Sequence, residues 1–84
     1  MELKIFGPEG SQILDASWVE LNTKSGNFVV QDGHTPMIVC LAADKEVVYC
    51  LANGKQETFT PTSGVAEITR HSVTLLLTQM PPSA

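Results

Sequence analysis

The apolar residues of this chain fall in short runs that turn-forming residues interrupt at regular intervals. The runs are rich in β-branched residues, and Gly, Pro, Asn or Asp separates them about every eight to twelve residues. No segment repeats apolar residues at helical spacing over three turns, so we expect essentially no helix. The pattern predicts an all-β fold, a small antiparallel β-sandwich or flattened barrel of about nine to ten short strands. We expect these strands near residues 2–6, 12–15, 17–22, 27–30, 37–42, 46–52, 55–60, 64–69 and 72–77.

Length and charge narrow the class of function. A chain of 84 residues makes one domain, which we place at residues 1–78, with residues 79–84 as a disordered tail. A domain of this size has modest stability, and binding a partner adds to it. The net charge of −4, with five Lys and Arg, argues against nucleic acid and against docking on anionic lipid. No apolar run approaches the roughly 20 residues of a membrane helix, and we expect no signal peptide.

Two predicted hairpins assign side chains to faces. Asn53-Gly54 suits a two-residue type I′ turn. This register sets Val48 opposite Phe59 and turns Tyr49 to the other face. Pairing around Arg70-His71 gives a second apolar face, and His71 should be solvated. The predicted core consists of Leu3, Ile5, Val19, Leu21, Phe28, Val30, Ile38, Cys40, Val48, Phe59, Ile68, Val73 and Leu75.

Two aromatic side chains are candidates for exposed interface anchors. If Val19 points inward, Trp18 points outward, where tryptophan is a frequent hot spot of protein interfaces. The alternative is that Trp18 packs against a loop of its own domain. Tyr49 points away from the predicted core face of its strand and is the second candidate.

The residues that carry chemistry do not form a catalytic or metal-binding pattern. Cys40 and Cys50 lie inside apolar runs, where buried reduced thiols are the expectation. The two His and two Cys lack the close ligand pairs of zinc sites, and no Gly-rich phosphate loop precedes a helix. We therefore predict no enzyme, no metal and no cofactor.

One alternative does involve covalent chemistry. Asp44-Lys45 lies near the middle of an all-β chain, and lipoyl carrier domains present Asp-Lys-Ala at a hairpin tip. Here Glu46 stands in place of the alanine, and a solvated turn is the simpler interpretation. Modification would add mass to Lys45. A free-standing β-sandwich adaptor is the third alternative.

The segment from Gly26 to Pro36 places an apolar strand between glycines and follows it with a Gly-His-x-Pro corner. This segment, with the runs Leu3-Lys4-Ile5, Ser63-Gly64-Val65-Ala66-Glu67-Ile68 and Val73-Thr74-Leu75-Leu76, resembles the N-terminal β-sandwich of the ε subunit of F-type ATP synthases. The resemblance extends from about Leu3 to Leu77.

The resemblance implies a non-catalytic coupling subunit of the central stalk, on the cytoplasmic side of the membrane. In that family the sandwich grips the γ subunit and rests on the c-ring, and it rotates with them during proton- or sodium-driven ATP synthesis. It implies a ring-facing loop made of Lys24, Ser25, Gly26, Asn27, Gln31 and Asp32. It implies a γ-facing side made of His34, Thr35, Met37 and Ser63, although His34 also suits a turn histidine that fixes the corner.

The chain departs from the family pattern at several positions. Leu21-Asn22-Thr23 replaces Leu-Pro-Gly before the ring-facing loop, and Val65 replaces the second Gly of Ser-Gly-Gly. Many members continue into a C-terminal pair of helices that inhibits ATP hydrolysis. We assign neither inhibition nor a nucleotide site to this chain.

Overall fold

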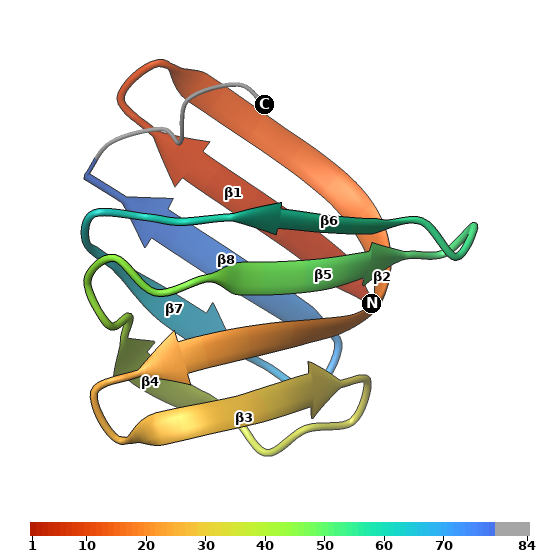
Figure 1. The fold of residues 1–84 in the computed structure, drawn as a ribbon. Helices are drawn as coiled ribbons and strands as arrows, with labels where there is room; N and C mark the ends of the chain where they lie inside the picture. The colour runs from red at the N-terminus through yellow and green to blue at the C-terminus, as the bar shows by residue number, and fades with distance from the viewer. Residues whose placement is uncertain (79–84) are drawn as a thin grey trace.

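The computed structural model describes residues 1–78, which form eight β-strands and no helix (Figure 1). The expected strands near 12–15 and 17–22 are one strand, so the predicted count of nine to ten was too high. The predicted tail at residues 79–84 lies outside the described residues. The strands are β1 (Glu2–Gly7), β2 (Gly10–Thr23), β3 (Gly26–Gln31), β4 (Met37–Cys40), β5 (Val47–Leu51), β6 (Gln56–Phe59), β7 (Gly64–Ile68) and β8 (Ser72–Leu77).

The strands form two layers packed face to face, which confirms the predicted β-sandwich. One layer, here called the β8 sheet, has the order β4-β7-β8-β1 followed by residues 10–15 of β2. The other, the β5 sheet, contains β3, residues 16–23 of β2, β5 and β6. All strand pairs are antiparallel except β1 with β8. Figure 1 shows the β5 sheet in front of the β8 sheet, with the strands of the two layers crossing.

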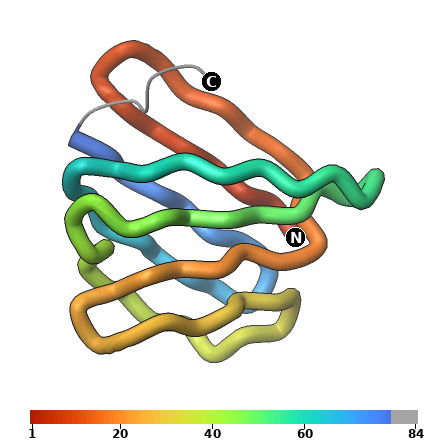
Figure 2. The backbone as a smooth tube through the Cα atoms, viewed as in Figure 1, coloured from red at the N-terminus to blue at the C-terminus, as the bar shows by residue number. Residues whose placement is uncertain are grey.

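β2 belongs to both sheets because it bends at its middle. Its pairing with β5 shifts register between Ala16 and Trp18, which leaves Ser17 as an extra residue. Such a bulge bends a strand and increases its twist. Figure 2 traces the result, an orange strand that runs along one layer and returns along the other. A single strand therefore connects the sheets without a loop, and β3, β4 and β6 are edge strands.

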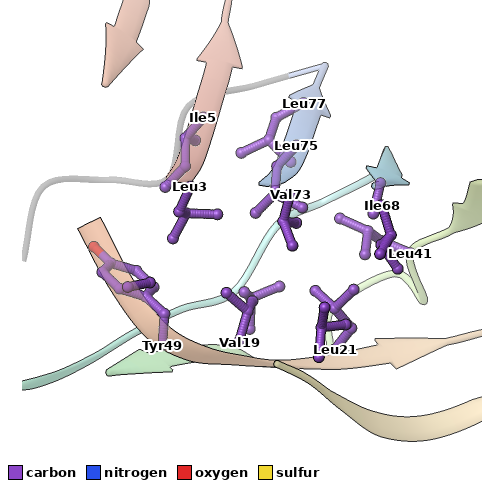
Figure 3. Close-up of a cluster of buried hydrophobic side chains, with 14 residues drawn as sticks. Leu3, Ile5, Val19, Leu21, Leu41, Tyr49, Ile68, Val73, Leu75 and Leu77 are labelled. Atoms are coloured by element: carbon purple, nitrogen blue, oxygen red, sulfur yellow. The ribbon is translucent and has the colours of Figure 1, made fainter. Parts of the chain in front are cut away.

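The core lies between the sheets and follows the alternation of side chains along each strand. Eight residues of the predicted core are buried, and Phe28 and Phe59 pack against them. Figure 3 shows Leu3, Val73 and Leu75 of the β8 sheet directed toward Val19, Leu21 and Tyr49 of the β5 sheet. The buried residues of the cluster are Leu3, Ile5, Ala16, Val19, Leu21, Val30, Leu41, Val47, Tyr49, Ala66, Ile68, Val73, Leu75 and Leu77.

The predicted hairpin at Asn53-Gly54 has a different turn and register. Leu51 N donates to Lys55 O at 2.8 Å, so residues 52–54 form a three-residue loop. Gly54 has φ +93°, but Asn53 lacks the positive φ that a type I′ turn requires. Val47, not Val48, is therefore opposite Phe59. A shift by one residue exchanges the two faces, so Val48 lies on the outer face and its prediction as a core residue was wrong.

β4 is the other place where the predicted core was wrong. Ile38 is 71% exposed and Cys40 is also exposed, whereas Val39 between them packs against the core. The run from Met37 to Ala42 is apolar at every position, so alternation in the sequence cannot say which side chains face inward. The expectation of two buried cysteines thus fails for Cys40 and holds for Cys50, which is 9% exposed.

Candidate interaction site on the outer face of the β8 sheet

The outer face of the β8 sheet carries a row of apolar side chains that crosses four strands. Cys40 pairs with Val65, Val65 with Leu76, and Leu76 with Phe6. Residues directly opposite each other on neighbouring strands point to the same face. We call these four residues the apolar stripe. Leu76 is 50% exposed and Phe6 is 37% exposed, so the stripe is open to solvent.

The next row of this face adds apolar groups at its two ends. Ile38 and Ile13, at 71% and 63% exposure, flank Glu67, Thr74 and Lys4. Six large hydrophobic side chains of residues 1–78 are exposed, and four of them lie on this one face: Phe6, Ile13, Ile38 and Leu76. Scattered exposed hydrophobics are ordinary, but a cluster of this kind is typical of an interaction surface.

The stripe follows from strands that are apolar on both faces. β8 ends in Leu75, Leu76 and Leu77, of which the first and last are buried and the middle one points outward. Sequence reasoning missed Phe6, Ile13, Val65 and Leu76 as candidate site residues. Three consecutive leucines in a predicted strand were the signal that could have found this face, because one of them must point away from the core.

A shallow hollow of about 340 Å³ lies at one end of the stripe. Ser63 and Thr78 form its polar rim, with 2.7 Å between their hydroxyl oxygens. Lys24 is the one Lys, Arg, Asp, Glu or His in its lining. The lining consists of Lys24, Cys40, Leu41, Ala43, Ser63, Gly64, Val65, Leu76 and Thr78.

The β2–β3 turn holds the first part of the loop that the sequence singled out. The buried Thr23 hydroxyl accepts from Ser25 N at 3.1 Å and donates to Gly26 O at 2.9 Å. Gly26 has φ +127°, which favours glycine. Asn27 Nδ2 then donates to Glu20 Oε2 at 3.1 Å on the outer face of the β5 sheet. Thr23 thus closes a turn in which the resembling family has Pro-Gly.

Gln31 and Asp32, the remaining residues of the predicted loop, lie at the opposite end of β3. The six-residue strand β3 places Gln31 about 17 Å from Gly26. Asp32 Oδ1 lies 3.1 Å from Nδ1 of His71 in the β7–β8 turn, so His71 has a partner besides solvent. The structure therefore does not bring residues 24–27 together with Gln31 and Asp32.

The predicted γ-facing residues are divided between the same two ends. His34 stacks on Phe28 with ring centroids 5.9 Å apart, and its Nδ1 lies 2.7 Å from Thr35 O. These contacts fit a histidine that fixes the corner. Met37, which is 38% exposed, begins β4 at this end. Ser63 instead lies at the other end, beside the hollow.

The two candidate aromatic anchors have different environments. Trp18 is half-buried on the outer face of the β5 sheet, opposite Cys50 and Gln31. Tyr49 is 6% exposed and packs edge-on against Phe59 in the core, so its prediction as an exposed anchor was wrong. Burial raises the pKa of the Tyr49 hydroxyl, and the nearby Glu57 carboxylate raises it further.

The loop that contains Lys45 is tied to its surroundings. Asp44 has φ +59° and its N donates to Pro61 O at 3.1 Å, while Asn22 Nδ2 donates to Glu46 O at 2.9 Å. The loop joins β4 of one sheet to β5 of the other, so Lys45 is not at the tip of a hairpin. This geometry argues against the lipoyl alternative.

Residues 1–78 contain no group of three His, Cys, Asp or Glu that could hold a metal ion. Cys40 and Cys50 point outward from different sheets, which separates the two thiols by the thickness of the sandwich. Within the described range no helix is long and apolar enough to cross a membrane.

Comparison with known proteins places this geometry in context. The family model described as ATP synthase, Delta/Epsilon chain, beta-sandwich domain matches residues 1–82. Among solved structures, a chain of the Euglena gracilis mitochondrial ATP synthase aligns with a TM-score of 0.79 and 18% identity over 94% of this chain and 51% of that one. A chain of the Tetrahymena thermophila mitochondrial ATP synthase central stalk and c-ring aligns with a TM-score of 0.78 and 15% identity. This alignment covers 94% of this chain and 63% of that one. This chain thus spans between half and two thirds of their length. Curated protein sequences give no match.

Proposed function

The chain belongs to the family of ATP synthase delta/epsilon β-sandwich domains, and we propose that it couples the c-ring to the γ subunit as a non-catalytic part of the central stalk. In this role it makes and breaks no bonds. It transmits rotation between subunits, which requires a stiff body and an interface that does not slip. The packed sandwich supplies the first, and the outer face of the β8 sheet is suited to supply the second.

The apolar stripe carries this proposal. Phe6, Val65 and Leu76 offer a continuous apolar surface at the centre of one sheet, and Glu67 and Lys4 lie in the neighbouring row. An apolar centre with polar groups at its margin is the usual anatomy of a protein interface. We assign this face to the γ subunit, with Thr35 and Met37 at its margin. His34 does not contact γ in this proposal; it stabilises the corner that leads into β4.

The β2–β3 turn is the proposed contact with the c-ring. Ser25, Gly26 and Asn27 are exposed at the end of the sandwich, and the Thr23 hydroxyl holds their backbone in place. Gln31 and Asp32 are at the far end of β3, so the ring-facing proposal is kept for the turn alone. Through these contacts the chain would sit on the cytoplasmic side of the membrane as a peripheral part of the complex.

Binding of purified γ subunit from the same synthase tests the proposal. Leu76→Asp places a charge in the stripe and should weaken γ binding by about 30-fold or more, because a buried unpaired charge is costly in an interface. Val29→Asp is the matched control, since Val29 is 48% exposed on the outer face of the β5 sheet. Wild-type affinity for γ in the Leu76→Asp variant, or absence of γ binding by the wild-type chain, would refute the assignment.

A further inference from the structure

We infer that the hollow at the end of the apolar stripe receives an apolar side chain of the γ subunit that lies next to a carboxylate, and that Lys24 binds this carboxylate. The inference rests on the proposed function and adds the contact that fixes the register of γ along the stripe. It also moves Lys24 from the ring-facing turn to the γ-facing side.

The hollow is continuous with the stripe. Cys40, Val65 and Leu76 belong to both, so a partner that covers the stripe also closes the hollow. A volume of about 340 Å³ is at the small end of the range for ligand pockets. Its apolar lining and its position at the edge of a flat sheet suit one protruding side chain, and a flat apolar sheet without such a feature would leave the partner free to slide.

The positive charge of Lys24 indicates which group of γ lies next to the apolar side chain that enters the hollow. Lys4 and Lys55 form ion pairs with Glu2 and Glu57. Lys24, an exposed residue that lines the hollow, forms no ion pair within 4.0 Å among residues 1–78. Covering it without a counter-charge would be costly, so a partner that closes the hollow must bring an anion.

The polar groups at the rim of the hollow are already hydrogen-bonded within the chain. Ser63 Oγ and Thr78 Oγ1 bond to each other at 2.7 Å, and Thr78 N donates to Ser63 O at 3.2 Å. With these polar groups satisfied within the chain, Lys24 is the lining residue whose charge can select a partner. The selected chemistry is a carboxylate beside an apolar residue. The γ subunit is favoured over the ring because Val65 and Leu76 open the hollow onto the face of the β8 sheet.

The first test reverses the charge. Lys24→Glu should weaken binding of purified γ by about tenfold or more at low salt, and high salt should reduce the difference. Lys45→Glu is the matched control, because Lys45 is exposed in the loop after β4 but does not line the hollow. It should bind γ with wild-type affinity. A γ carboxylate whose reversal to Lys restores binding to Lys24→Glu would identify the partner group.

The second test fills the hollow. Cys40→Phe should weaken γ binding by about tenfold, because the new ring occupies the space of the γ side chain. Val29→Phe, on the outer face of the β5 sheet and outside the hollow, is the control and should bind γ with wild-type affinity. Thermal unfolding of each variant separates loss of binding from loss of folding.

The outcomes distinguish this inference from the proposed function. If Leu76→Asp abolishes γ binding but Lys24→Glu and Cys40→Phe bind as wild type, the stripe is the interface and the hollow inference is wrong. If Lys24→Glu weakens binding to isolated c-ring and not to γ, Lys24 faces the ring and the inference is also wrong. A wild-type homodimer that Lys24→Glu dissociates would assign the hollow to a second copy of this chain, which again overturns it.

Discussion

The outer faces of the two sheets differ although both inner faces build the same core. On the β8 sheet the outer face exposes Phe6, Ile13, Ile38 and Leu76. On the β5 sheet an amide and carboxylate network covers one end, where Asn27 Nδ2 donates to Glu20 and to Asn22 Oδ1. The need to build a core explains why the inner faces are apolar, but it does not explain an apolar outer face. The apolar outer face of the β8 sheet adds nothing to the core, which is why we interpret it as a binding surface. The polar groups at one end of the β5 sheet already bond to each other within the chain.

The largest expected effect separates the two faces of one strand. Leu75→Ala should lower the free energy of unfolding by about 2–5 kcal/mol, because Leu75 is 0% exposed and its removal leaves a cavity. Leu76→Ala should change it by less than about 0.5 kcal/mol, as at an ordinary surface position. Urea unfolding of both variants measures the difference. Equal losses of unfolding free energy in the two variants would show that the outer face also stabilises the fold, which would contradict the proposed difference between the two faces.

Two glycines give the next effect, one in each sheet. A Cβ at Gly64 would lie 2.8 Å from Leu76 O and 2.8 Å from Leu77 Cδ2. Gly64→Ala should therefore cost about 1–3 kcal/mol through crowding. At Gly26 a Cβ would meet nothing within 4 Å, but the φ of +127° disfavours any side chain, so Gly26→Ala should cost about 1 kcal/mol. Chemical denaturation of the two variants measures both losses of unfolding free energy. A larger loss for Gly26→Ala than for Gly64→Ala would contradict the prediction.

Trp18 sharpens the comparison from the β5 side. Trp18→Ala should destabilise the domain by about 1–2 kcal/mol, because the half-buried ring packs on the outer face. It should leave γ binding unchanged, in contrast to Leu76→Asp. Calorimetry of unfolding measures the loss of stability in this variant, and titration with γ measures its affinity for γ. A loss of γ affinity in a folded Trp18→Ala variant would make the β5 face part of the interface.

The smallest expected effect is at Asp32 and His71, which belong to neither the proposed γ contact nor the proposed ring contact. The side chains of Asp32 and His71 are 61% and 81% exposed, so the contact between them is screened by solvent. Asp32→Asn should change the free energy of unfolding by less than about 1 kcal/mol and leave γ affinity as it is. Thermal melts and γ titration of this variant test the point, and a marked loss of affinity would bring this end into the interface.

The sequence predicted the fold well and the site poorly, for related physical reasons. Short apolar runs, glycines and prolines specify strands and turns, and alternation placed Leu3, Val19 and Val73 correctly in the core. Alternation fails where every position of a run is apolar, as for Ile38 and Cys40. A one-residue error at the Asn53-Gly54 turn was enough to exchange Tyr49 with Val48.

The site depends on contacts that no local pattern encodes. Phe6, Leu76, Val65 and Cys40 become neighbours only through the order of strands in the β8 sheet, including the parallel pair of β1 and β8. The separation of Gln31 from residues 24–27 follows from the length of β3. Positions near each other in sequence were grouped into one loop, whereas the strand between them carries them to opposite ends.

The reactivity of Cys40 tests the central claim most directly, because this exposed thiol lies in the apolar stripe. In a Val29→Cys variant, maleimide labelling followed by peptide mass spectrometry compares the two outer faces within one molecule. If γ covers the β8 face, Cys40 should react at least about tenfold more slowly in the complex than in the free chain, while the thiol introduced by Val29→Cys keeps its rate. An unchanged rate at Cys40, or protection at position 29 in its place, would contradict the account.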